Sequence, residues 1–162
     1  MRMMSLLTAA PFLLVLGSSG CMSMMMGKMK SEMFVIRESG HGFEATVERI
    51  KKAVGTLEGW ILVESYDNQE RYRATGDIGR QVVIVACKPQ VAVRMLGPDE
   101  NKQMAGMIPL KIVVSRRGDG KTQVSWMNVE MMSQMFDGEL REALQKAARQ
   151  LSAQMDRQLG GT

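Results

Sequence analysis

The sequence contains one histidine and two cysteines among its 162 residues, and this scarcity excludes several kinds of catalytic site. A serine–histidine–aspartate triad would have to use His41, which lies in a glycine-rich turn with no recognisable nucleophile motif. No Cys-x-x-Cys pair, glycine-rich phosphate loop or His/Asp/Glu metal-ligand spacing is present. We therefore expect no enzymatic activity, and we interpret His41 as an exposed or capping residue at the start of a helix.

Aromatic residues are also scarce, at 5% of the sequence, and the net charge is only +4. The basic residues are interspersed with acidic ones and do not cluster with aromatic residues, as they do on surfaces that bind nucleic acid. The sequence therefore gives no support for a nucleic-acid partner.

No apolar run is long enough for a membrane span, but a shorter run lies near the N-terminus, at residues 6–16. Arg2 precedes this run, and small residues follow it up to Cys21, as in a bacterial lipoprotein signal peptide. Ser18 stands where such signals usually have leucine. We expect residues 1–20 to be a cleaved leader and Cys21 to carry acyl chains such as palmitate, which anchor the protein to a membrane. The alternative is an ordinary secretory leader, after which Cys21 would be a free thiol.

The residue after the expected lipidation site indicates in which membrane the protein would be anchored. Met22 stands where an aspartate would resemble a signal for retention in the inner membrane. We therefore expect the outer membrane of a Gram-negative cell envelope, with the protein facing the periplasm.

Methionine is abundant, with 17 residues in the chain. Several of them fall in residues 21–32, which we interpret as a tether. Thioethers are soft ligands that select Cu(I) over harder ions, so the tether is a candidate Cu(I) or Ag(I) site to which Cys87 could contribute. The alternative is that methionine fills irregular gaps and adaptable surfaces without any metal. The candidate metal ligands are Met22, Met24, Met25, Met26 and Met29.

The segment 81–114 organises the rest of the chain. Residues 82–86 are a β-branched apolar run that predicts a buried strand, which ends before Pro89. A short helix follows and stops at Gly97, after which residues 99–106 are polar and predict an exposed loop. Pro109 then opens a second buried strand.

Helices and strands are also predicted before and after this segment. Apolar residues at helical spacing predict one helix after Gly42 and a long one near the C-terminus, with a break at Asp137 and Gly138. Further strands are predicted at residues 33–37, 60–65, 69–75 and 122–127. The order β-α-β-β-β-α-β-β-α predicts a single α+β domain over residues 33–159, with an antiparallel sheet and helices packed on one face.

The Cys87-x-Pro89 turn, the short helix, the Gly/Asp loop and Pro109 at a strand start together resemble the family called domain of unknown function 302. Gly42-Phe43 and Gly59-Trp60 fit the same pattern. Two positions depart from it, because Lys88 stands where asparagine is frequent and Leu110 where cysteine is frequent. The resemblance implies a small α+β domain similar to TATA-binding-protein-like sheets, commonly dimeric, and implies no activity.

Cys87 is the thiol that remains once Cys21 is acylated, and its position allows two interpretations. A strand end before a helix N-terminus lowers a thiol pKa and makes it reactive, whereas apolar neighbours raise the pKa and leave a small buried hydrophobe. Our leading hypothesis is a lipid-anchored module, with a homodimer possible, that binds a small ligand or a protein partner. The candidate ligand-binding residues are Cys87, Pro89, Pro109 and His41.

Overall fold

Five antiparallel strands form one sheet in the spatial order β1-β5-β4-β3-β2 in the computed structural model, which describes residues 32–160. The strands are β1 (Phe34–Ser39), β2 (Ile61–Asp67), β3 (Gln81–Cys87), β4 (Leu110–Arg116) and β5 (Thr122–Met127). The first two strands in the sequence therefore occupy opposite edges of the sheet, and the helix between them must cross its face. That helix is α2 (Phe43–Thr56).

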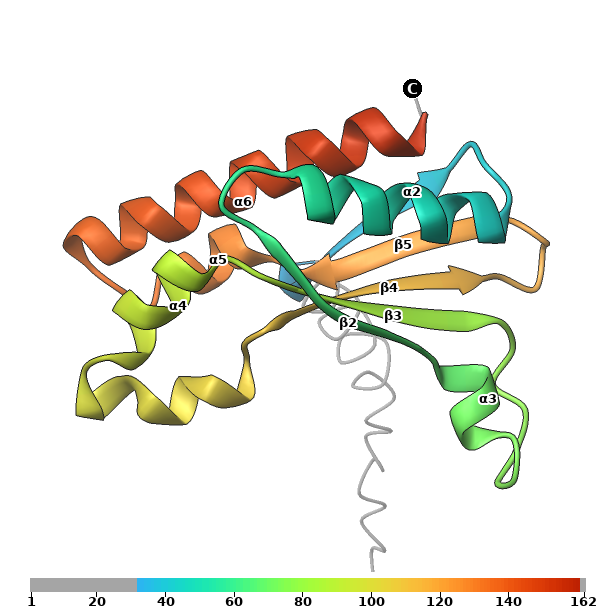
Figure 1. Cartoon of the computed structure of the whole chain (residues 1–162), viewed down its shortest axis with the longest axis horizontal. Helices are drawn as coiled ribbons and strands as arrows, with labels where there is room; N and C mark the ends of the chain where they lie inside the picture. Colours follow the sequence, from blue (N-terminus) through green and yellow to red (C-terminus); the bar gives the residue numbers. More distant parts are fainter. Residues whose placement is uncertain (1–31, 161–162) are drawn as a thin grey trace, which may run out of the picture.

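Helices α2 and α6 (Gly138–Leu159) lie side by side on the same face of the sheet (Figure 1). Strands β4 and β5 alternate between buried residues on this face and more exposed residues on the other, as expected for a sheet with one covered face. The fully buried side chains include Ile50 from α2, Ile112 from β4 and Leu151 from α6. These contacts confirm the predicted α+β class and the helix layer on one face.

Strand β3 is buried along most of its length, as the apolar run at residues 82–86 predicts. The helix α4 (Pro89–Leu96) follows it, with Pro89 in the first turn, where its missing N–H removes no helical hydrogen bond. The predicted loop is instead a 3₁₀-helix, η1 (Asp99–Gly106), which has no buried residue. It remains polar and mostly exposed, so this prediction was wrong only in its backbone conformation.

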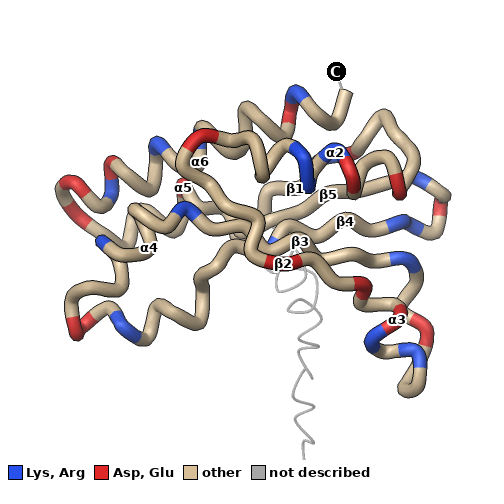
Figure 2. Tube along the Cα trace, in the orientation of Figure 1, with Lys and Arg blue, Asp and Glu red and all other residues tan. Residues whose placement is uncertain are grey.

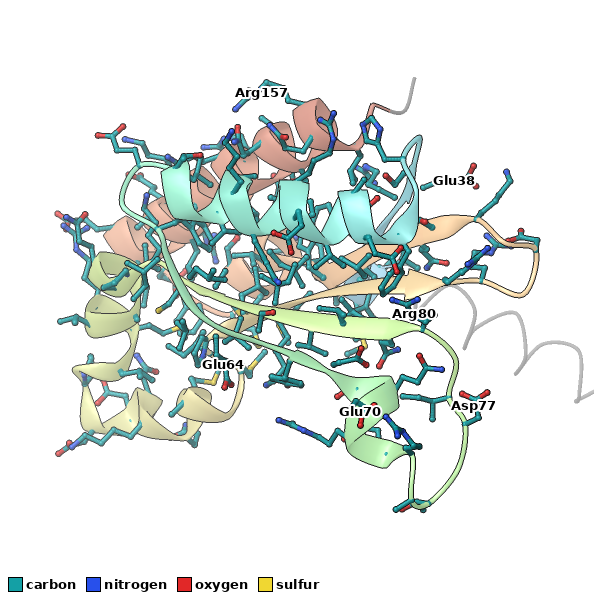
Figure 3. All side chains as sticks on the ribbon, turned by 45° about the vertical axis from the view of Figure 1, so that its right-hand side comes forward. Glu38, Glu64, Glu70, Asp77, Arg80 and Arg157 are labelled. Carbon is teal, nitrogen blue, oxygen red and sulfur yellow. The ribbon has the colours of Figure 1, made fainter. Side chains whose placement is uncertain are left out.

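The strand predicted at residues 69–75 is not formed, and this prediction was wrong. The segment contains the short helix α3 (Asn68–Tyr72), and the Asp67 carboxylate accepts a hydrogen bond from the Glu70 backbone N–H at 3.1 Å. This contact caps the N-terminus of α3 and favours a helix over continued extension of β2. The sheet consequently has five strands rather than six. Figure 3 labels Glu70 on α3 and Asp77 beside the loop that leads back to β3.

The C-terminal region divides into two helices, as the residues Asp137 and Gly138 predict. The first is α5 (Val129–Ser133), which Asn128 caps by accepting from the backbone N–H of Met131 at 3.1 Å. The second is α6, which begins at Gly138 with a φ of 56°. The expected leader, Cys21 and the methionines of the expected tether lie outside the described residues, so the predictions about them, and the domain boundaries, stay predictions.

Candidate functional site

A small pocket lies at the end of the sheet where β3 finishes and β4 begins. Ala86 of β3 pairs with Leu110 of β4, so Cys87 and Pro109, one residue beyond this pair, flank the same end of the sheet. The cavity has a volume of about 50 Å³. We call it the Cys87 pocket, and it is lined by Trp60, Ala86, Cys87, Lys88, Val91, Ala92, Met95, Met107, Ile108, Pro109, Leu110, Met127, Val129, Met132, Leu144 and Ala147.

The walls of the Cys87 pocket come from most layers of the fold. Strand ends supply one side, α4 supplies Val91 and Met95, and the helices α5 and α6 supply Met132 and Ala147. Nearly all of these side chains are apolar, and four are methionines. Because methionine is unbranched and flexible, such walls can adapt to ligands of different shape. The arrangement suits a small apolar ligand.

The thiol of Cys87 is half-buried and unpaired among the described residues. Burial raises its pKa above the ordinary thiol value, because removing water disfavours the thiolate. The thiol is therefore protonated at neutral pH and is a poor nucleophile and a poor metal ligand in that form. The structure favours the small hydrophobe over the reactive thiolate.

One cation lies at the rim of the Cys87 pocket. The Nζ of Lys88 donates hydrogen bonds to the backbone oxygen of Glu58 at 3.1 Å and to Gln150 Oε1 at 2.8 Å. It also lies 5.9 Å from the centroid of the Trp60 ring. The indole N–H of Trp60 donates to the same Gln150 oxygen at 3.3 Å. All acceptors of Lys88 are neutral, so these contacts orient the ammonium charge without neutralising it.

The structure brings together only part of the set of ligand-binding residues predicted from the sequence. Cys87 and Pro109 both line the pocket, and the Ile108–Pro109 peptide bond is cis. Pro89 is exposed and is not among the lining residues; its place in the first turn of α4 fixes where that helix starts. Pro89 therefore affects the pocket only by setting where α4 begins.

His41 lies far from the pocket, at the other end of α2. Its ring approaches Gly160, where an added Cβ would lie 3.1 Å from His41 Nε2, while its backbone N–H donates to Ser39 Oγ at 3.1 Å. The pocket lies beyond the C-terminal end of α2, a 14-residue helix about 21 Å long. The structure therefore separates His41 from Cys87 and gives it a place in the β1–α2 turn.

Sequence reasoning missed Trp60, Lys88 and Gln150 as site residues. Trp60 was interpreted only as a strand residue that fits the family pattern, and Lys88 only as a departure from that pattern. The apolar stripe of α6 gave an indirect signal for Gln150, because that residue directly precedes Leu151 of the stripe. The spacing of apolar residues could not show that α6 packs against α4 and against the turn that precedes β2.

Two negative findings apply to the described residues. Within residues 32–160 no group of three or more His, Cys, Asp or Glu side chains could hold a metal ion. The same part of the chain has no helix that is both long and apolar enough to cross a lipid bilayer.

Comparison with known proteins agrees with the resemblance seen in the sequence. The chain is similar to a solved structure, the uncharacterized conserved protein DUF302 from Bacillus stearothermophilus, with a TM-score of 0.65 and 24% identity. The match covers 77% of this chain and 97% of that one, and at this identity it shows the fold alone. No curated protein matches the sequence significantly. A family model described as domain of unknown function DUF302 matches residues 35–158. Because that match runs from β1 to the last turn of α6, the protein belongs to the domain of unknown function 302 family.

Proposed function

We propose that this protein is a lipid-anchored envelope module that binds a small apolar ligand in the Cys87 pocket. The observation that carries the proposal is the pocket itself, whose walls are apolar and whose rim holds one oriented ammonium group. Ligand sites commonly combine such walls with a few placed polar groups. Among the described residues no group of three or more His, Cys, Asp or Glu side chains could hold a metal ion, and the Cys87 thiol of the pocket is protonated, so we favour binding over catalysis.

The size of the cavity limits the ligand. A dry cavity of about 150 Å³ admits benzene or xenon, and the Cys87 pocket, at about 50 Å³, is about a third as large. We infer that it accepts a short aliphatic group, with the rest of the ligand outside. Movement of the four methionines would enlarge it.

Xenon and butan-1-ol test this proposal because both are small and neutral. The readout is the NMR spectrum of methionine methyl groups, which places reporters directly in the pocket wall. Met95, Met107, Met127 and Met132 should shift on binding, while the exposed Met131 and Met135, which are not among the lining residues, should not. Unchanged pocket methyl signals at saturating xenon would count against the proposal.

A pocket-filling substitution provides the matched control. Ala92→Leu adds a larger side chain to the pocket wall at a half-buried position of α4 and should reduce the shifts. Ala153→Leu makes the same change on the exposed face of α6 and should leave them intact. If both variants bind as the parent does, the ligand does not occupy this cavity.

The lipid anchor of the proposal is supported by the apolar run at residues 6–16 and the small residues before Cys21. Replacing Cys21 with serine should move the protein from the membrane fraction to the soluble fraction or leave it unprocessed. Membrane association that persists in this variant would remove the anchor from the proposal.

A second candidate function is the binding of Cu(I) or Ag(I). One observation favours it, since four methionines and Cys87 line the same pocket. Thioether sulfur binds these soft ions without losing a proton, whereas the protonated Cys87 thiol must lose one. Metal analysis of the purified protein and Ag(I) titration of the pocket methyl signals separate this candidate from the apolar ligand.

A further inference from the structure

We propose that the ligand of the Cys87 pocket is an amphipathic anion, whose short apolar group fills the pocket and whose anionic head lies in an adjoining basic groove. This inference rests on the proposed function and names the chemical class of its ligand. The groove lies between α4 and α6 and is lined by Glu58, Gly59, Lys88, Gln90, Val91, Arg94, Ala143, Lys146 and Gln150. Lys88 and Val91 line both the groove and the pocket, so the two adjoin at these residues.

The charges of the groove are unbalanced. It contains the three cations Lys88, Arg94 and Lys146, against the single carboxylate of Glu58. Among the described residues these three cations form no ion pair, although eight ion pairs occur elsewhere in the domain. Figure 2 shows basic residues on α4 and on α6 at the same end of the molecule. An anion that enters the groove therefore meets uncompensated positive charge.

The geometry of the two helices keeps these charges together. Gln90 and Arg94 are four residues apart on α4, and Lys146 and Gln150 are four residues apart on α6, so each pair lies on one face of its helix. Gln150 and Glu58 hold the ammonium group of Lys88 between pocket and groove. Arg94 and Lys146 are exposed and can turn toward a ligand. A fixed central cation with mobile flanking cations suits a carboxylate or phosphate head.

The test compares four ligands with the same butyl chain: pentanoate, butyl phosphate, butan-1-ol and butylammonium. The full chain is held in nanodiscs of zwitterionic lipid, and binding is followed by the methyl signals of the pocket methionines. The two anions should bind more tightly than the alcohol, and the alcohol more tightly than the ammonium. Comparing pentanoate with butyl phosphate then distinguishes the two kinds of anionic head. Raising the salt from about 0.01 M to about 0.15 M shortens the Debye length from about 30 Å to about 8 Å and should weaken only the anions.

Substitutions of the exposed groove cations locate the head. Arg94→Gln and Lys146→Gln should each weaken anion binding about two- to fivefold, as expected for exposed charge pairs, with little change for the alcohol. Lys52→Gln removes an exposed charge from α2 outside the groove and is the matched control, which should change neither.

The outcomes separate the two proposals. If the alcohol binds as tightly as the anions, and neither salt nor the groove variants matter, the anionic head is wrong while the apolar pocket stands. Tighter binding of butylammonium would also overturn the anionic head. If xenon and all four ligands leave the pocket signals unchanged, the proposed function fails, and this inference fails with it.

Discussion

The ammonium group of Lys88 donates to Gln150 Oε1 over 2.8 Å, and this contact joins the first residue before α4 to the middle of α6. Gln150 also accepts from Trp60 and donates from Nε2 to the Glu58 backbone oxygen at 3.1 Å. The neutral side chain of Gln150 therefore connects α6 to α4 and to the turn before β2 at the rim of the pocket. Gln150 is the residue whose loss should loosen the rim most.

Gln150→Ala should lower the free energy of unfolding by about 1–2 kcal/mol, because half-buried donors on Lys88 and Trp60 lose an acceptor. Urea unfolding followed by circular dichroism measures this change. Gln145→Ala, on the same helix and also half-buried, has no side-chain hydrogen bond among the described residues and is the control. Equal losses in the two variants would show that the network contributes nothing beyond helix packing.

The raised pKa of Cys87 predicts how stability changes in alkaline solution. Because the folded thiol holds its proton more tightly than the unfolded thiol, its contribution is fully present below the unfolded pKa of about 8.5 and is lost as pH rises through the folded pKa. The difference in unfolding free energy between the parent and Cys87→Ala should therefore be constant at neutral pH and become less favourable to the parent above about pH 8.5. Chemical unfolding of both proteins across this range measures the difference, and parallel pH profiles would contradict the prediction.

Alkylation of Cys87 offers an independent measurement. In the folded protein it should react with iodoacetamide more slowly than a free thiol at the same pH, and at the normal thiol rate after unfolding, because the thiolate is the reactive form. Fast alkylation of the native protein would restore the interpretation of Cys87 as a reactive centre.

Dimerisation stays a prediction, but the structure limits which surfaces of the domain could form the dimer interface. The apolar stripe of α6 packs in the core, so it is not available to a second copy. Ile61, Leu62 and Val63 are exposed on the edge strand β2, where unpaired backbone groups can pair with another chain. We expect Val63→Lys to convert a dimer to a monomer in sedimentation, and Ile78→Lys, an equally exposed residue outside any strand, to leave it unchanged. A parent protein that sediments as a monomer at high concentration would contradict the prediction.

The expected tether gives a separate prediction about soft metals. If Met22, Met24, Met25, Met26 and Met29 encircle Cu(I) together, deletion of residues 22–29 should lower the affinity steeply, and binding by thioethers alone should persist in mild acid. A Cu(I) titration of both versions measures this. Equal affinity in both would assign any copper binding to the pocket methionines, and no binding in either would leave the tether as a spacer.

The sequence predicted the structure best where an apolar pattern is bounded by proline or glycine. The run at residues 82–86, Pro89 and Gly97 correctly predicted β3 and α4. The error at α3 arose because residues 69–75 contain few apolar side chains, so alternation carried little information there. The Asp67 cap that decides the local structure is a short-range contact that pattern counting ignored.

Only some residues of the candidate site could be predicted from the sequence. Cys87 and Pro109 could be placed together because Cys87 ends one strand and Pro109 precedes the next, and one short connection joins the two. Strands that follow each other in the sequence are commonly neighbours in the sheet. Trp60, directly before β2, and Gln150 of α6 are 90 residues apart in the sequence and meet at the site. Their meeting depends on how α2 and α6 share the sheet face, which is a property of three-dimensional packing. The sequence also could not show that α2 separates His41 from the Cys87 pocket.

The pairing of β1 with β5 also determines the order in which the chain can assemble. Phe34 lies opposite Met127, so the first strand of the sheet pairs with the last strand in the sequence. Until β5 is in place, β1 has no neighbour in the sheet. A contact over so long a stretch of chain closes slowly, because the entropy of the intervening loop must be lost first. The β1–β5 pairing therefore joins the two paired strands that lie farthest apart in the sequence, and the Met127 side of the pocket is completed in the same step.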